Sequence, residues 1–90
     1  MTEKERTKYE QMAINYLADI LREAENWAID FLDKEVKENW EVEVTLTYGG
    51  PTVRLDLKDN EVIFNFSYQP FEYSELITDR ELIEKIKQAI

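Results

Sequence analysis

Glycine and proline, the residues that most often interrupt helices and strands, occur at only two places in this chain of 90 residues. Gly49, Gly50 and Pro51 form one cluster, and Pro70 stands alone. Proline removes a backbone donor and glycine favours turns, so we expect the chain to change direction at these two places. For the first 48 residues, secondary structure therefore has to be predicted from hydrophobic periodicity alone.

Residues 7–38 contain neither glycine nor proline and are rich in Ala, Leu, Glu and Lys. At 100° per residue, their apolar side chains gather on one face of a helix, opposite a polar and mostly acidic face. The sequence therefore predicts one long amphipathic helix over about residues 7–38. Its core-facing residues are Tyr9, Ala13, Tyr16, Ile20, Ala24, Trp27 and Phe31.

A second apolar strip widens this face past half of the helix circumference. A helix that rests on one sheet needs only a narrower stripe. The strip must therefore pack against the C-terminal helix or against a second subunit. We favour the C-terminal helix, and with it a monomer rather than a homodimer. The strip consists of Ile14, Leu21, Ile29, Leu32 and Val36.

From Trp40 onward the hydrophobic period changes to two, which is typical of half-buried strands. Strands are predicted at about residues 40–48, 52–58 and 61–68, with Trp40 facing the core and Asp59-Asn60 as the second turn. This register places core residues opposite core residues. The expected pairs are Leu57 with Val62, Leu55 with Phe64, Val53 with Phe66, Val44 with Leu55 and Leu46 with Val53.

The C-terminal part of the chain predicts one more helix. Residues 72–76 fit either a short edge strand or an irregular return. Thr78 and Glu81 form a capping box, which predicts a helix at about residues 79–89 with Thr78 as its N-cap. We therefore expect one α+β domain over residues 1–90. A long N-terminal helix packs on a three- to four-stranded antiparallel meander, and a short C-terminal helix follows.

Composition removes many kinds of active site. The chain has no His and no Cys, which excludes Ser-His-Asp and Cys-His nucleophiles, thiolate zinc sites, redox motifs and disulfides. We expect a protein that is not an enzyme and that has no cofactor. Its 20 acids against 11 bases give a net charge of -9. Nucleic acids and anionic membranes need clustered Lys and Arg, so we expect neither as a direct ligand.

The longest purely apolar run is three residues, and the N-terminal residues lack the apolar stretch of a signal peptide. No transmembrane or targeting segment is therefore predicted. The absence of Cys fits a reducing compartment, and we expect the protein in the cytoplasm.

Two short acidic motifs suggest metal chemistry. Asp56-Leu57-Lys58 has the acid-x-Lys form of metal-dependent nucleases, and the expected register places Glu43 opposite Asp56. Asp56, Asp59 and Glu61 surround the second turn, but their spacing is not that of an EF-hand loop. Such short matches are frequent in charged sequences. We therefore rank a metal-dependent hydrolase last among the hypotheses and expect no metal site.

The acids fall in two blocks. Residues 19–43 carry nine acids and three bases, and residues 56–84 carry eight acids and two bases. The ordinary interpretation is a solvated surface. The functional interpretation is a negative surface for a basic partner, at the extreme a mimic of DNA phosphates. The candidate contacts are Asp19, Glu23, Asp30 and Asp33, in a row along the helix, and Glu43, Asp56, Asp59 and Glu61 around the second hairpin.

Three aromatic residues lie outside the regular pattern. Tyr48 is at the first turn, and Phe71 and Tyr73 are in the return segment. They either cap the edge of the core or anchor a partner, as aromatic residues in a polar rim commonly do.

The run Val44-Thr45-Leu46-Thr47-Tyr48-Gly49-Gly50-Pro51 is followed by two strands and then by Tyr68, Pro70, Phe71-Glu72-Tyr73 and Glu81-Leu82. Over residues 42–84 this pattern resembles a loose family of small acidic proteins from bacteriophages and mobile elements. In that family a Trp or Tyr precedes Gly-Gly-Pro, and no catalytic residues are assigned. The resemblance implies an inhibitor of host defence, such as an anti-CRISPR protein, acting in the cytoplasm of the bacterial host.

Two functional hypotheses rank above the metal-dependent hydrolase. The leading one is a non-enzymatic inhibitor that binds a basic protein surface of a CRISPR-type, nucleic-acid-handling complex, by acidic mimicry of DNA or by steric block. The alternative is a small dimerising assembly or scaffold module without inhibitory activity.

Overall fold

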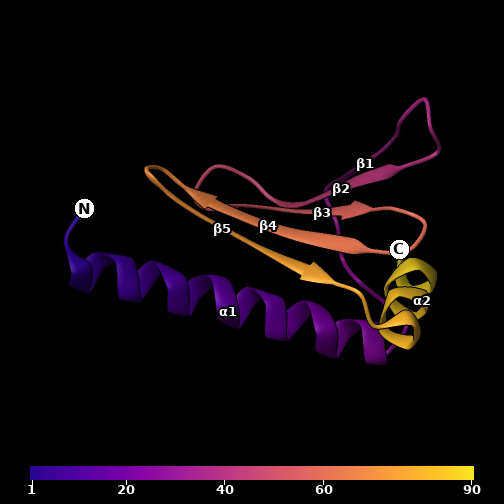
Figure 1. Cartoon of the computed structure of the whole chain (residues 1–90), viewed down its shortest axis with the longest axis horizontal. Coiled ribbons are helices and arrows are strands. Elements are labelled where there is room, and N and C mark those ends of the chain that lie inside the picture. The colour runs from indigo at the N-terminus through magenta and orange to yellow at the C-terminus, as the bar shows by residue number, and fades with distance from the viewer.

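The computed structural model describes all 90 residues and has an α+β fold (Figure 1). Helix α1 precedes a five-stranded antiparallel sheet, and helix α2 follows it. The strands lie side by side in chain order. The sheet has one strand more than the three to four predicted. The elements are α1 (Glu3–Glu25), β1 (Asp33–Val36), β2 (Val42–Thr47), β3 (Thr52–Leu57), β4 (Val62–Tyr68), β5 (Phe71–Ile77) and α2 (Arg80–Ala89).

Helix α1 begins four residues earlier than predicted because Thr2 and Glu5 form a capping box. The Glu5 backbone N–H donates to Thr2 Oγ1 at 3.2 Å, and the Thr2 N–H donates to Glu5 Oε1 at 3.4 Å. The two side chains thus satisfy two backbone donors that a helix start leaves free.

Helix α1 ends at Glu25, so the prediction of a helix through residue 38 is wrong. The Ala28 N–H donates to Glu23 O at 3.2 Å and the Trp27 N–H to Ala24 O at 3.0 Å, which is the pattern of a Schellman motif. Trp27 has a φ of 59°, a conformation that glycine or asparagine usually supplies at this place. The helix therefore ends without glycine or asparagine at the position that usually signals a helix end.

The residues after the end of α1 form β1, an edge strand that the sequence analysis does not predict. Leu32 N–H donates to Thr45 O at 2.8 Å, and β1 then pairs with β2 from Asp33 opposite Thr45 to Val36 opposite Val42. All four residues of β1 are exposed. Trp27 and Trp40, both predicted to face the core, are instead 53% and 85% exposed.

The predicted register of the β3–β4 hairpin is confirmed: Leu57 lies opposite Val62, Leu55 opposite Phe64 and Val53 opposite Phe66. Between β2 and β3, Val44 faces Leu55 as predicted. Thr47 rather than Leu46 lies opposite Val53, because the register shifts at a bulge between Thr45 and Thr47. Residues 71–77 form a full strand paired with β4, which resolves the open choice for the return segment.

The N-cap of α2 is Asp79 and not the predicted Thr78. Its Oδ1 accepts from the Leu82 N–H at 3.0 Å. Aspartate caps a helix as well as threonine does, so the helix begins one residue later at no cost in capping.

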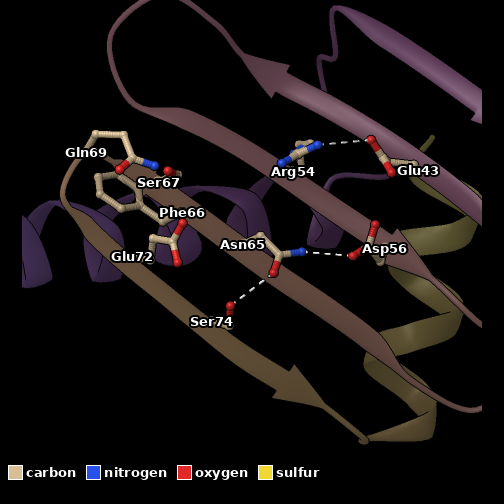
Figure 2. Close-up of a pocket in the computed structure, with 9 residues that line it drawn as sticks. All are labelled: Glu43, Arg54, Asp56, Asn65, Phe66, Ser67, Gln69, Glu72 and Ser74. Carbon is tan, nitrogen blue, oxygen red and sulfur yellow. Dashed lines mark hydrogen bonds and ion pairs between the residues drawn. The ribbon is translucent and has the colours of Figure 1, made fainter.

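Both helices cover one face of the sheet, and the opposite face is open (Figure 1; Figure 2). The core joins Ala13, Leu17, Ile20 and Ala24 of α1 to the inward residues of β2–β5 and to Ile83 and Ile86 of α2. Neither helix has the length and apolarity that crossing a membrane would need.

The second apolar strip is only partly covered by the C-terminal helix. Ile29 is 4% exposed, and its N–H donates to Ala89 O at the end of α2 at 3.0 Å. Ile14, Leu32 and Val36 stay 42%, 65% and 54% exposed.

Replacing Phe64 by Ala is expected to lower the free energy of unfolding by about 3–5 kcal/mol, because it empties the fully buried pair with Leu55. Urea denaturation measures this loss. Tyr48→Ala, at a side chain that is 76% exposed, is the control and should change stability by less than about 0.5 kcal/mol. Equal losses at the two sites would contradict the described core.

Candidate acidic binding surfaces

The open face of the sheet is mostly polar and carries several acids, although Ile63 of β4 and Leu76 of β5 also lie on it. Residues directly opposite each other in neighbouring strands point to the same face, so the register identifies them. Glu35 of β1 lies opposite Glu43 of β2, which in turn lies opposite Asp56 of β3. The predicted pairing of Glu43 with Asp56 is therefore confirmed. A second row across the sheet consists of Asp33, Thr45, Arg54, Asn65 and Ser74.

A hollow of about 370 Å³ lies on this open face (Figure 2). Three hydrogen bonds order its side chains. Arg54 Nη1 donates to Glu43 Oε1 at 3.3 Å, Asn65 Nδ2 to Asp56 Oδ2 at 3.0 Å, and Ser74 Oγ to Asn65 Oδ1 at 3.0 Å. The residues that line the hollow are Glu43, Arg54, Asp56, Asn65, Phe66, Ser67, Gln69, Glu72 and Ser74.

Glu43 is the most strongly compensated acid of this face. Lys37 Nζ lies 2.9 Å from Glu43 Oε2, and Arg54 approaches the other oxygen. The hydrogen bond from Lys37 and its charge hold the pKa of Glu43 below its usual value, with Arg54 adding to the effect and burial opposing it. Glu43 in turn raises the pKa of Lys37. The negative charge of Glu43 is thus more fully neutralised than that of Glu35 or Asp56, which lie beside it in the same row.

The acid-x-Lys motif does bring its residues together. Asp56, Lys58 and Glu43 line a second hollow of about 190 Å³, which Lys37 also borders. No group of three or more Asp and Glu side chains is arranged to hold a metal ion. Two cations and the Asn65 amide already bind the carboxylates of Glu43 and Asp56.

The row of four acids predicted along the helix does not exist, because α1 ends at Glu25. Asp19 and Glu23 are on α1, and Asp30 lies in the connection to β1. These three acids still line one hollow of about 250 Å³ beside the end of β2. Asp33 lies apart from them, on β1 and on the open face of the sheet. Asp19 forms an ion pair with Arg22.

Asp59 and Glu61 belong to the β3–β4 turn, which the Lys58 N–H closes by donating to Glu61 O at 2.9 Å. Lys87 Nζ donates to Asp59 O at 3.3 Å and so connects this turn to α2. The two acids therefore lie next to a lysine-bearing part of the molecule rather than within the acidic face.

The three aromatic candidates do not form one surface. Tyr48 is 76% exposed at the β2–β3 turn. Phe71 is buried, with its ring centroid 6.0 Å from that of Phe66, and Tyr73 packs edge-on against Phe64 at 6.3 Å. Burial, and then the nearby charges of Glu75 and Glu10, raise the pKa of Tyr73. Phe71 and Tyr73 cap the core, which leaves Tyr48 exposed on its own.

Sequence reasoning missed two acids of the open face. The sequence predicts Glu35 within the helix over residues 7–38, whereas the structure places it on β1 opposite Glu43. Glu72 lines the open-face hollow, and the apolar–polar alternation of residues 71–74 is the signal that could have placed it there.

Comparison with known protein families, with curated proteins and with solved structures finds no match for this chain. Its function has to be argued from charge, exposure and geometry.

The Lys37–Glu43–Arg54 cluster predicts a specific pH dependence. Glu43→Gln should lower the free energy of unfolding at pH 7 by less than about 1 kcal/mol, because the cluster is solvent-accessible. The pKa of Glu43 is lowered by folding, so its contribution is present above the usual value of 4.5 and is lost as the pH falls through the lowered pKa.

Urea midpoints measured between pH 7 and pH 3 check this expectation. The difference between wild type and Glu43→Gln should close at the acid end. Glu35→Gln, on the same row but without an ion pair, is the matched control and should show little difference at any pH. A Glu43→Gln difference that stays constant down to pH 3 would contradict the assigned role of the cluster.

Proposed function

We propose that this chain is a non-enzymatic inhibitor that uses its acidic surface to bind the basic, nucleic-acid-binding surface of a CRISPR-type host defence complex in the bacterial cytoplasm. The observation that carries the proposal is the excess of uncompensated carboxylates. Of the 20 acids, only Asp19, Glu25, Glu43 and Glu81 form ion pairs with Lys or Arg. No charged residue is buried, so the other carboxylates are open to a partner.

The open sheet face supports mimicry of a phosphate backbone. Neighbouring strands lie about 4.8 Å apart, so Glu35, Glu43 and Asp56 step across the sheet at intervals of that order. Successive phosphates of one DNA strand rise by about 3.4 Å, a spacing of the same order. Arginine and lysine that bind phosphates would meet similarly spaced oxygens here, with charge-assisted hydrogen bonds to Glu35 and Asp56, whereas at Glu43 they would compete with Lys37 and Arg54.

The net charge of -9 supports the same partner class. A basic groove that attracts nucleic acid attracts any surface with a similar negative potential, and complementary potentials accelerate association. Since exposed charges are screened within about 8–10 Å at physiological salt, binding of this kind weakens steeply as salt rises.

Charge reversal on the open face is expected to abolish inhibition. The double variant Glu35→Lys, Glu72→Lys changes two acids that form no ion pair, so the melting temperature should be almost unchanged. The assay is displacement of labelled duplex DNA from a purified CRISPR effector, followed by fluorescence anisotropy at low and high NaCl concentrations. Wild-type protein should displace DNA at low salt and lose this ability as salt rises.

The matched control is Glu23→Lys, Asp30→Lys, which changes the net charge by the same amount at the hollow beside α1. It should leave displacement intact if the open face is the binding surface. If both double variants displace DNA like the wild type, charge mimicry is wrong. Steric block through the exposed Tyr48 is then the mechanism to test.

One observation favours the alternative of a dimerising module. Leu32 and Val36 are 65% and 54% exposed, at and beside the edge strand β1, whose outer backbone groups have no partner strand. The charged residues Asp33, Lys34 and Glu35 on the same strand act against edge-to-edge pairing. We therefore expect a monomer.

Light scattering at micromolar concentration measures the oligomeric state, and Leu32→Glu is the diagnostic variant because its side chain is exposed in the monomer. Wild type and variant should both have the mass of one chain. A wild-type dimer that dissociates on Leu32→Glu would favour the scaffold module over the inhibitor.

A further inference from the structure

A second, chemically different surface lies where α2 ends beside the β3–β4 turn (Figure 1). A hollow of about 270 Å³ opens there between the end of α2, the β1–β2 hairpin and the end of β3. Its apolar lining comes from Val42, Leu57 and Ile90. Val42 and Leu57 are cross-strand partners, and Leu57 is buried in the core on the helix side of the sheet. The hollow shares Val42 and Lys58 with the smaller hollow around Glu43 and Asp56, but neither of those two acids lines it.

Three lysines border this hollow: Lys34 of β1, Lys58 at the end of β3 and Lys87 of α2. None of them forms an ion pair with an acid, although the chain has almost twice as many acids as bases. Lys87 donates to the backbone oxygen of Asp59, and Asp59 is the one acid that lines the hollow. The local charge is positive in a molecule whose net charge is -9.

The overall negative charge does not cancel this local excess. At physiological salt, exposed charges more than about 8 Å away are largely screened, so an anion in the hollow responds mainly to the lysines around it. Asp59 and the C-terminal end of α2, which presents roughly half a negative elementary charge, together offset only part of the charge of the three ammonium groups.

Trp40 borders the same hollow and adopts a backbone conformation that does not suit tryptophan. Its φ is 65°, and its N–H donates to Lys37 O at 3.0 Å while the Lys37 N–H donates to Glu41 O at 2.8 Å. Trp40 is thus the last residue of a three-residue hairpin loop, a position that usually takes glycine. Its side chain is 85% exposed, so neither turn geometry nor packing calls for an indole here.

An exposed indole beside several ammonium groups is suited to one kind of ligand. The indole face stacks on an aromatic ring, as in proteins that bind nucleobases, and lysines bind phosphate as point charges. The volume is slightly below the usual range for ligand pockets, which favours a small ligand.

We infer that this hollow is a binding site for a small aromatic phosphate of the mononucleotide class, with the base stacked on Trp40 and the phosphate held by Lys34, Lys58 and Lys87. The inference stands independently of the proposed inhibitory function, because none of the acids of the open face lines this hollow.

The first test is a titration of the Trp27→Phe variant, in which Trp40 is the only tryptophan, with adenosine monophosphate. Tryptophan fluorescence should be quenched to saturation. Adenosine and inorganic phosphate are the two control ligands, and each retains only one of the two interactions. Each should bind at least about tenfold more weakly, since stacking or charge is lost.

The second test uses two variants whose binding is measured by calorimetry. The double variant Lys58→Glu, Lys87→Glu should weaken binding of adenosine monophosphate at least about tenfold. The control is the double variant Lys4→Glu, Lys8→Glu, which changes the net charge by the same amount on α1 and should bind like the wild type. Trp40→Gly should also abolish binding. Glycine is free to adopt a positive φ, so this variant should melt at the wild-type temperature or above it.

Three outcomes would overturn the inference. One is the absence of saturable binding at millimolar nucleotide. Another is binding of inorganic phosphate as tight as that of adenosine monophosphate, which would mean that Trp40 contributes nothing to the affinity. The third is a Trp40→Gly variant that binds adenosine monophosphate as tightly as the wild type at any melting temperature, because the indole would then not contact the base.

Discussion

The register between β3 and β4 is the constraint on which the rest of the structure depends. Leu55 opposite Phe64 and Val53 opposite Phe66 place four of the most deeply buried side chains on one face of the sheet. A slip of one residue would turn all of them to solvent. Since α1 and α2 both pack on this apolar face, the opposite face is left mainly to polar residues, with Ile63 and Leu76 as apolar exceptions.

This one-sided packing explains how a small chain tolerates 20 acids. No charged residue is needed in the core, so most carboxylates remain hydrated and unpaired. Where charges do meet, as Lys37 and Arg54 meet Glu43, they order the open face but neutralise little of the net charge. Because these carboxylates stay hydrated, folding requires little desolvation of charge. The same hydrated carboxylates are the groups that the proposed basic partner would contact.

The end of α1 at Glu25 decides where both candidate binding surfaces lie. The Schellman motif around Trp27 releases residues 27–32, and β1 then joins the sheet beside β2. This single change moves Asp33 and Glu35 onto the acidic open face and carries Lys34 and Trp40 to the lysine-lined hollow. Two tryptophans with positive φ thus lie at the two turns that position the candidate binding surfaces.

The sequence by itself determined the α+β class, the β3–β4 register, the pairing of Glu43 with Asp56 and the excess of acids, because alternation and charge are local properties of the chain. It could not determine the end of α1, since Trp27 and the residues after it keep a helical period and contain no glycine or proline. Only the tertiary structure decided that the Leu32 N–H pairs with Thr45 O, thirteen positions away. A strand edge is stabilised by residues distant in sequence, so the convergence of Lys34, Lys58 and Lys87 has no local signal.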